Sequence, residues 1–181
     1  MLLKWPSLNK SEKEFILKQL LMYLDELHTC KYVIKFKNSA LSSLLDTYDE
    51  YMNEITALDI LNDKKIAYLQ EFKNVICTLF KDAKVGLIHG DLHFNNVLIN
   101  NRSEIVLIDF ENMGKSFIVK EFDPISRMSR NPNSFNSNSK VQLSNSDFSN
   151  IMNFIKNNIA EISTDKFDDR LLFFDCLNSL K

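Results

Sequence analysis

The stretch Leu87-Ile-His-Gly-Asp-Leu-His-Phe-Asn-Asn-Val-Leu-Ile99, followed by Ile105-Val-Leu-Ile-Asp-Phe-Glu111, decides which fold and chemistry we expect of this chain. Asp91 lies in a loop after a short apolar run, Asn96 ends that loop, and Asp109 ends the second strand of a predicted hairpin. These groups suit phosphoryl transfer, in which a carboxylate orients the attacking hydroxyl while an Asn and an Asp hold Mg²⁺ on the nucleotide phosphates. We therefore predict Asp91 as the catalytic base and Asn96 with Asp109 as the metal ligands.

Short runs rich in β-branched residues surround these three side chains. They predict strands at 85–89, 97–100 and 104–110, and the polar turn at 100–103 joins the last two strands into a hairpin. The whole chain contains only three Gly and three Pro, which is few for a protein built on many tight turns. The sequence therefore predicts a predominantly helical α+β domain with a small β-hairpin that carries the site.

Helices are predicted on both sides of the site, because apolar residues recur there at three- and four-residue intervals. Ser11 and Glu14 have the spacing of a capping box that opens the first helix. An Asn- and Ser-rich stretch without apolar periodicity predicts a loop at 131–146. The predicted helices cover residues 11–28, 39–61 and 63–80, then a short segment at 124–128, and finally 147–162 and 166–180 within the C-terminal part 147–181.

The composition limits the class of protein. A chain of 181 residues with 45% apolar residues is long enough for one packed domain, 1–181. Its net charge of −2 shows no block of like charge, so we expect neither a nucleic-acid partner nor a membrane partner. Three widely spaced cysteines, no signal sequence and no long apolar run predict a cytoplasmic protein.

The motif His89-Gly-Asp91 with Asn96 and Ile108-Asp-Phe-Glu111 resembles the aminoglycoside phosphotransferase and choline kinase family of the protein-kinase-like superfamily. The resemblance covers about residues 10–130 and is strongest over 87–111. It implies the large C-terminal lobe of a kinase-like fold, with Mg²⁺ and ATP or another nucleoside triphosphate as cofactors. It also implies transfer of the γ-phosphoryl group to a hydroxyl of a small molecule, such as an aminoglycoside, choline, another amino alcohol or a sugar.

Other polar residues near the motif have supporting roles in this interpretation. We expect His89 to bond the backbone and shape the loop, and His93 to pack within it. Glu111 is interpreted as a contact for a metal-bound water or a cation, or as a plain surface residue. Asp123 is expected either to orient the loop around Asp91 or to cap the helix that starts at Pro124.

The N-terminal lobe that holds ATP in this family is expected to be absent from this chain. The first ten residues are too short for even a three-stranded sheet, and no G-x-G-x-x-G occurs. The run Tyr32–Phe36 contains Lys35 but follows the first helix, which is the wrong order for a phosphate-binding lysine. We expect a phosphotransferase that is truncated and impaired as a lone chain, a subunit that a separate chain completes with the N-lobe, or a repurposed domain.

Two alternatives of a different class follow from the same residues. A non-catalytic kinase-like binding or regulatory module would keep the scaffold and turn over no ATP. A metallohydrolase would use His89, Asp91 and His93 as ligands, but it leaves Asn96 and Asp109 unexplained.

Overall fold

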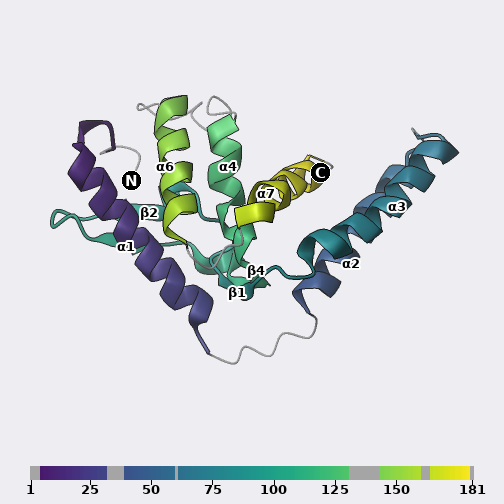
Figure 1. The fold of residues 1–181 in the computed structure, drawn as a ribbon, viewed down its shortest axis with the longest axis horizontal. Helices are drawn as coiled ribbons and strands as arrows, with labels where there is room; N and C mark the ends of the chain where they lie inside the picture. Colours follow the sequence, from purple (N-terminus) through teal and green to yellow (C-terminus); the bar gives the residue numbers. More distant parts are fainter. Residues whose placement is uncertain (1–4, 32–38, 60, 131–142, 160–163, 180–181) are drawn as a thin grey trace.

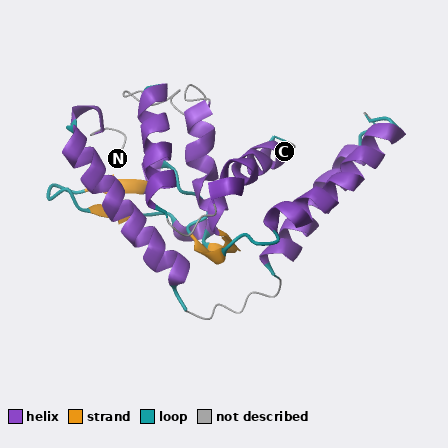
Figure 2. Cartoon of the chain, in the orientation of Figure 1, coloured by secondary structure: helices purple, strands orange, loops and turns teal. Residues whose placement is uncertain are grey.

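The computed structural model describes residues 5–31, 39–59, 61–130, 143–159 and 164–179 (Figure 1). The run Tyr32–Phe36 and most of the predicted loop at 131–146 lie outside the described residues. The described part consists mainly of helices with two small antiparallel sheets (Figure 2). The predicted helix-dominated α+β class is therefore confirmed.

The first long helix is α1 (Lys10–Thr29), which follows the short 3₁₀ helix η1 (Trp5–Ser7). Its capping box is formed by Asn9 and Glu12. The Asn9 side chain accepts the Glu12 N–H at 3.0 Å, and the Glu12 carboxylate accepts the Asn9 N–H at 2.7 Å. The predicted Ser11–Glu14 box is wrong, because Asn9 offers the same spacing and lets the helix begin one residue before Ser11.

Two further helices, α2 (Ala40–Ala57) and α3 (Asp63–Phe80), form a hairpin that projects from the rest of the molecule (Figure 1). Ser39 and Asn62 cap them, since each side chain accepts a backbone N–H of the first turn. Within the hairpin, the Tyr48 hydroxyl donates to a backbone carbonyl of α3 at 2.6 Å. The hairpin meets the body near its base, where α2 contacts β4 and α3 contacts α7.

The sheets are two separate strand pairs. β2 (Val97–Ile99) pairs with β3 (Ile105–Leu107) as the predicted hairpin, and β1 (Val85–Ile88) pairs with β4 (Gly114–Phe117), a strand that was not predicted. Gly86 in β1 permits α1 to pack closely, because a Cβ there would lie 2.7 Å from the backbone oxygen of a residue near the end of α1. This contact fixes α1 against the strand that leads into the site.

The C-terminal part consists of the 3₁₀ helix η4 (Ile118–Phe122) and the helices α4 (Asp123–Arg130), α6 (Asn145–Asn158) and α7 (Thr164–Asn178). In Figure 1, α4, α6 and α7 lie above the strands β1 and β4. None of the helices found in the described ranges is long and apolar enough to cross a membrane.

Several predicted helix boundaries differ from the structure, and two of these differences have a clear local reason. α2 ends at Ala57 rather than at 61, because Asp59 has a φ of 52°, which a right-handed helix cannot continue. α6 begins at Asn145, inside the predicted loop, because Ser144 and Asp147 form a capping box. The Ser144 hydroxyl group donates to the Asp147 carboxylate at 2.6 Å and accepts the Asp147 N–H at 3.2 Å.

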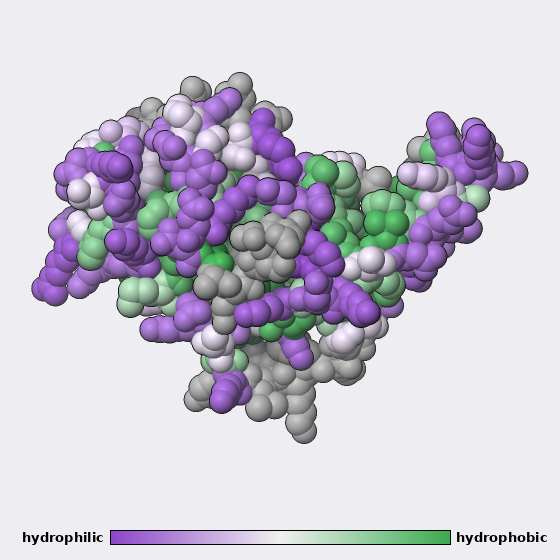
Figure 3. All heavy atoms as spheres, in the orientation of Figure 1, coloured by the Kyte–Doolittle hydropathy of each residue, from purple (hydrophilic) through white to green (hydrophobic). Residues whose placement is uncertain are grey.

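Phenylalanine rings join the elements into one core. The ring of Phe80 lies 4.7 Å from that of Phe117, which connects α3 to β4. The ring of Phe94 stacks on that of Phe148 at 5.7 Å, which anchors the segment after Asp91 to α6. Apolar side chains also reach the surface near the junction of the α2–α3 hairpin with the body (Figure 3).

Candidate active site

Residues 89–96, called the Asp91 loop below, form a tight turn that the Asn96 side chain closes. Asn96 Nδ2 donates to the backbone oxygen of Asp91 at 3.0 Å, and the His93 N–H donates to the same oxygen at 2.9 Å. Two donors on one carbonyl fix the backbone at Asp91. Because the amide nitrogen of Asn96 is used in this way, its Oδ1 is the atom that remains for a ligand.

His89 connects the Asp91 loop to the strand that precedes Asp109. Its Nε2 lies 2.8 Å from the backbone oxygen of Ile108, and its Nδ1 accepts the Asp91 N–H at 3.4 Å. An accepting Nδ1 assigns the ring proton to Nε2, which then donates to Ile108. The ring is fully buried, and its centroid lies 4.6 Å from that of Phe110. Both ring nitrogens therefore bond backbone groups of the site.

Asp109 is held beside the Asp91 loop because both backbone polar groups of Ile108 bond to that loop. The Ile108 carbonyl accepts a hydrogen bond from His89 Nε2, and the Ile108 N–H donates to the backbone carbonyl oxygen of Asn96 at 3.0 Å. Asp109 has φ 66° and ψ 61°, a left-handed conformation that a short polar side chain tolerates. This turn ends β3 at Leu107, short of the predicted end at 110, and leaves the Asp109 carboxylate exposed at the start of η3 (Phe110–Asn112).

The Asp91 loop is also held by a buried carboxylate outside the motif. This carboxylate belongs to Glu121 in η4. Its Oε2 accepts the His89 N–H at 2.6 Å, and its Oε1 accepts the Gly90 N–H at 3.3 Å. His28 Nε2 at the end of α1 lies 3.5 Å from the same carboxylate, which has no exposed surface. Glu121 is therefore a positioning residue that the sequence motif did not reveal.

Asp123 does not orient the Asp91 loop through any hydrogen bond to it among the described residues. It is the first residue of α4, where its carboxylate accepts from Asn178 Nδ2 at 2.8 Å and pairs with Arg127 Nε at 3.1 Å. Burial raises the pKa of the Asp123 carboxyl above its ordinary value, and the positive charge of Arg127 offsets only part of that effect. Asp123 therefore connects α4 to α7, and Glu121 has the orienting role that was one of the two roles expected of Asp123.

A cleft of about 520 Å³ opens beside Asp91. Asp91 and Gly90 form part of its wall, while α2 lies on one side and β4, α4 and α7 contribute the rest. The Asp91 side chain is 37% exposed, so its carboxylate can reach a molecule in the cleft. A volume of this size suits a small ligand.

His93 and Glu111 take different places around the site. His93 Nε2 lies 3.5 Å from the Asp91 carboxylate, so His93 flanks the candidate base. Glu111 is exposed in η3, two residues after Asp109, and makes no hydrogen bond or ion pair with any described residue.

The structure gives little support to a zinc site built from His89, Asp91 and His93. Among the described residues, no group of three or more His, Cys, Asp or Glu side chains is arranged to hold a metal ion. Both nitrogens of His89 bond the backbone as described above. Asn96 and Asp109 carry oxygen donors instead, the ligand type that Mg²⁺ takes from proteins while it keeps waters and phosphates as its other ligands.

One face of the β2–β3 hairpin is apolar and exposed. Leu98 and Val106 are directly opposite each other in the antiparallel register and are 45% and 50% exposed. Ile108, which precedes Asp109, is also exposed. An apolar surface therefore continues from the hairpin to the candidate metal ligands.

The chain resembles known phosphotransferases in sequence pattern and in fold. The family model described as the phosphotransferase enzyme family matches residues 3–123. Among solved structures, the gentamicin–APH(2″)-IIa complex matches with a TM-score of 0.66 at 13% sequence identity. That match covers 98% of this chain and 57% of the other, so the chain spans little more than half the length of the protein it resembles. A search of curated protein sequences finds no match.

Proposed function

The chain belongs to the phosphotransferase enzyme family, and we propose that it forms the helical, catalytic lobe of an enzyme that phosphorylates a hydroxyl group of a small molecule. The phosphoryl donor is ATP or another nucleoside triphosphate. The observation that supports this proposal is the pair of hydrogen bonds that the Ile108 backbone makes with the Asp91 loop. These bonds hold the residue before Asp109 beside the loop that carries Asp91 and Asn96.

Each residue has a distinct part in the proposed reaction. Asp91 borders the cleft and accepts or orients the proton of the acceptor hydroxyl as general base. Asn96 Oδ1 and the Asp109 carboxylate hold Mg²⁺, which neutralises charge on the transferred phosphate when it is bound. Glu121 and His89 fix the backbone that carries these groups, and this rigidity matters because phosphoryl transfer depends on positioning and charge stabilisation.

The nucleotide needs a second surface besides this site. The exposed apolar face formed by Leu98 and Val106 is suited to the flat face of a base, next to the ligands for its phosphates. The other side of the nucleotide would be covered by a segment beyond these 181 residues, in the same polypeptide or in a separate chain. We place the reaction in the cytoplasm, in agreement with the three free cysteines Cys30, Cys77 and Cys176.

Substitution of the base tests the reaction itself. In a protein that includes the nucleotide-covering segment, Asp91→Asn should lower the rate of γ-phosphoryl transfer by at least about 10²-fold, the usual contribution of a general base. The circular dichroism spectrum and melting temperature should stay unchanged, because Asp91 is partly exposed. A variant that retains the full transfer rate would show that Asp91 is not the base.

Metal binding can be tested on the present chain alone. Mn²⁺ with ATP should broaden the NMR signals of residues around Asn96 and Asp109, and Asp109→Asn should abolish that broadening. Asp25→Asn, which makes the same change at an exposed position on α1, should leave it intact. Equal broadening in both variants would refute the assignment of Asp109 as a ligand.

A further inference from the structure

The chemical character of the cleft beside Asp91 narrows the class of acceptor. Its wall on α2 carries three hydroxyl groups, those of Ser43, Thr47 and Tyr51. They are spaced by four residues, so they lie on one face of the helix. Asn112 and Asn178 add amide groups to the described lining. Such a surface offers many donors and acceptors to a ligand that carries several hydroxyl groups.

The charged side chains of the cleft are mainly basic. The described lining includes Lys115 on β4, Lys120 on η4 and Arg127 on α4, against two carboxylates, Asp91 and Asp123. The Asp123 carboxylate already accepts from Asn178 and pairs with Arg127. Arg127 and Asp123 therefore offset each other, which leaves Lys115 and Lys120 against Asp91 among the charged side chains of the described lining.

This balance disfavours an acceptor that carries several ammonium groups. Such a molecule would bring its charges close to the Lys115 and Lys120 ammonium groups and would gain at most one carboxylate partner. An anionic group is instead attracted by the ammonium groups of Lys115 and Lys120, whose exposed side chains border the cleft.

We propose that the cleft binds a polyhydroxylated acceptor with an anionic group, a phosphate or a carboxylate, that lies against Lys115 and Lys120 while a hydroxyl faces Asp91. This inference rests on the proposed function for the identity of the cleft as the acceptor site. It adds the charge of the acceptor and the two residues that select it.

Isothermal titration of the full chain tests the selection without requiring any phosphoryl transfer. The probes are ribose 5-phosphate against ribose, gluconate against sorbitol, and gentamicin as a polycation. We expect each anion to bind at least tenfold more tightly than its neutral counterpart and gentamicin to bind more weakly than either anion. The two matched pairs also show whether phosphate or carboxylate is preferred.

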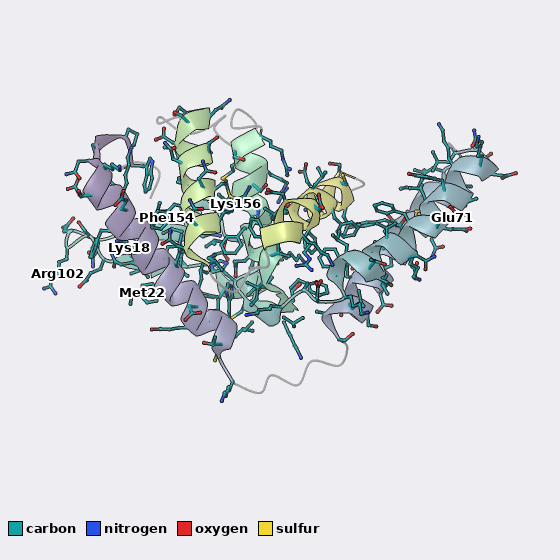
Figure 4. The ribbon with its side chains drawn as sticks, in the orientation of Figure 1. Lys18, Met22, Glu71, Arg102, Phe154 and Lys156 are labelled. Carbon is teal, nitrogen blue, oxygen red and sulfur yellow. The ribbon has the colours of Figure 1, made fainter. Side chains whose placement is uncertain are left out.

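Charge reversal locates the anion. Lys115→Glu replaces an attraction with a repulsion and should weaken binding of the preferred anion about tenfold or more. Lys120→Glu should act in the same direction and provides a second test if Lys115→Glu unfolds. Lys18→Glu makes the same change on the exposed surface of α1, away from the cleft (Figure 4), and should stay within twofold of the wild type.

The outcomes separate this inference from the function on which it rests. Tighter binding of gentamicin than of the anions, no anion binding up to 10 mM (about the weak limit of a useful affinity), or equal effects of Lys115→Glu and Lys18→Glu would overturn the inference. A phosphotransferase with a different acceptor would remain possible in each case. If the anions bind as expected but Asp91→Asn leaves transfer unchanged, the proposed catalytic role fails and the charge preference of the cleft stands.

Discussion

Replacement of Glu121 by Gln removes a negative charge from the carboxylate that holds the Asp91 loop. In the wild type, its two oxygens accept the N–H groups of His89 at 2.6 Å and Gly90 at 3.3 Å, and the side chain has no exposed surface. Gln keeps one acceptor oxygen but turns an NH₂ group toward the other N–H. If the oxygen stays with His89, the partly buried N–H group of Gly90 faces another donor.

The cost follows from these contacts. A hydrogen bond to a charged group contributes about 1.5–3 kcal/mol, and an unsatisfied buried donor costs about 1–3 kcal/mol. The change converts one charged bond into a neutral one and loses the other, so we expect Glu121→Gln to lower the free energy of unfolding by about 2–4 kcal/mol. His28 Nε2, 3.5 Å from the carboxylate, can recover a small part of this by accepting from the new NH₂.

Urea denaturation followed by circular dichroism measures this difference, and amide hydrogen exchange at His89 and Gly90 shows where it arises. Glu111→Gln is the matched control, because it makes the same change at an exposed position and should shift stability by less than about 0.5 kcal/mol. If Glu121→Gln were as stable as this control, or if exchange at the two amides did not accelerate, the positioning role of Glu121 would be refuted.

Three further substitutions test other parts of the structure by urea denaturation. Gly90→Ala should destabilise by more than about 1 kcal/mol, because Gly90 has a φ of 85° and a Cβ there would overlap the backbone oxygen of Asn112; wild-type stability would contradict this loop geometry. Phe80→Ala should cost about 3–5 kcal/mol because its fully buried ring joins α3 to β4 and α7, whereas Phe15→Ala, at a position 53% exposed, should cost far less. For Asp147, burial alone raises the pKa, but the Ser144 hydrogen bonds and Lys13 more than offset it, so the folded-state pKa lies below the ordinary 3.8. The stability that this carboxylate contributes is therefore present above pH 3.8 and lost as the pH falls below it, and the deficit of Asp147→Asn should shrink from pH 7 to pH 2.5; a constant deficit would argue against this coupling.

Several features of the fold were predictable from the sequence because they depend on neighbours within a few residues. The periodicity of apolar residues identified α1, α2 and α3, and the turn at 100–103 identified the β2–β3 hairpin. Errors arose where two local signals competed. Asn9 and Ser11 both have the spacing of a helix cap, and only the observed hydrogen bonds select Asn9.

The residue types of the candidate site were also visible in the sequence. Asp91, Asn96 and Asp109 follow the spacing of the phosphotransferase motif that the sequence resembles, and their catalytic and metal-binding roles stay predictions for the experiments above. That Ile108 holds them together through its backbone could not be predicted, because backbone hydrogen bonds do not depend on the identity of the side chain.

What the sequence by itself determined is therefore the local structure and the reactive groups, because helix periodicity, turn chemistry and motif spacing act over short separations. The tertiary structure alone decided the pairing of β1 with β4, the clamp of Glu121 on the Asp91 loop and the charge of the cleft. The first two bring together residues that lie 26 to 32 positions apart, and the third depends on how β4, η4 and α4 are arranged around Asp91. Such contacts depend on how the whole chain packs, and that packing sets where Asp91 stands and which molecules can reach it.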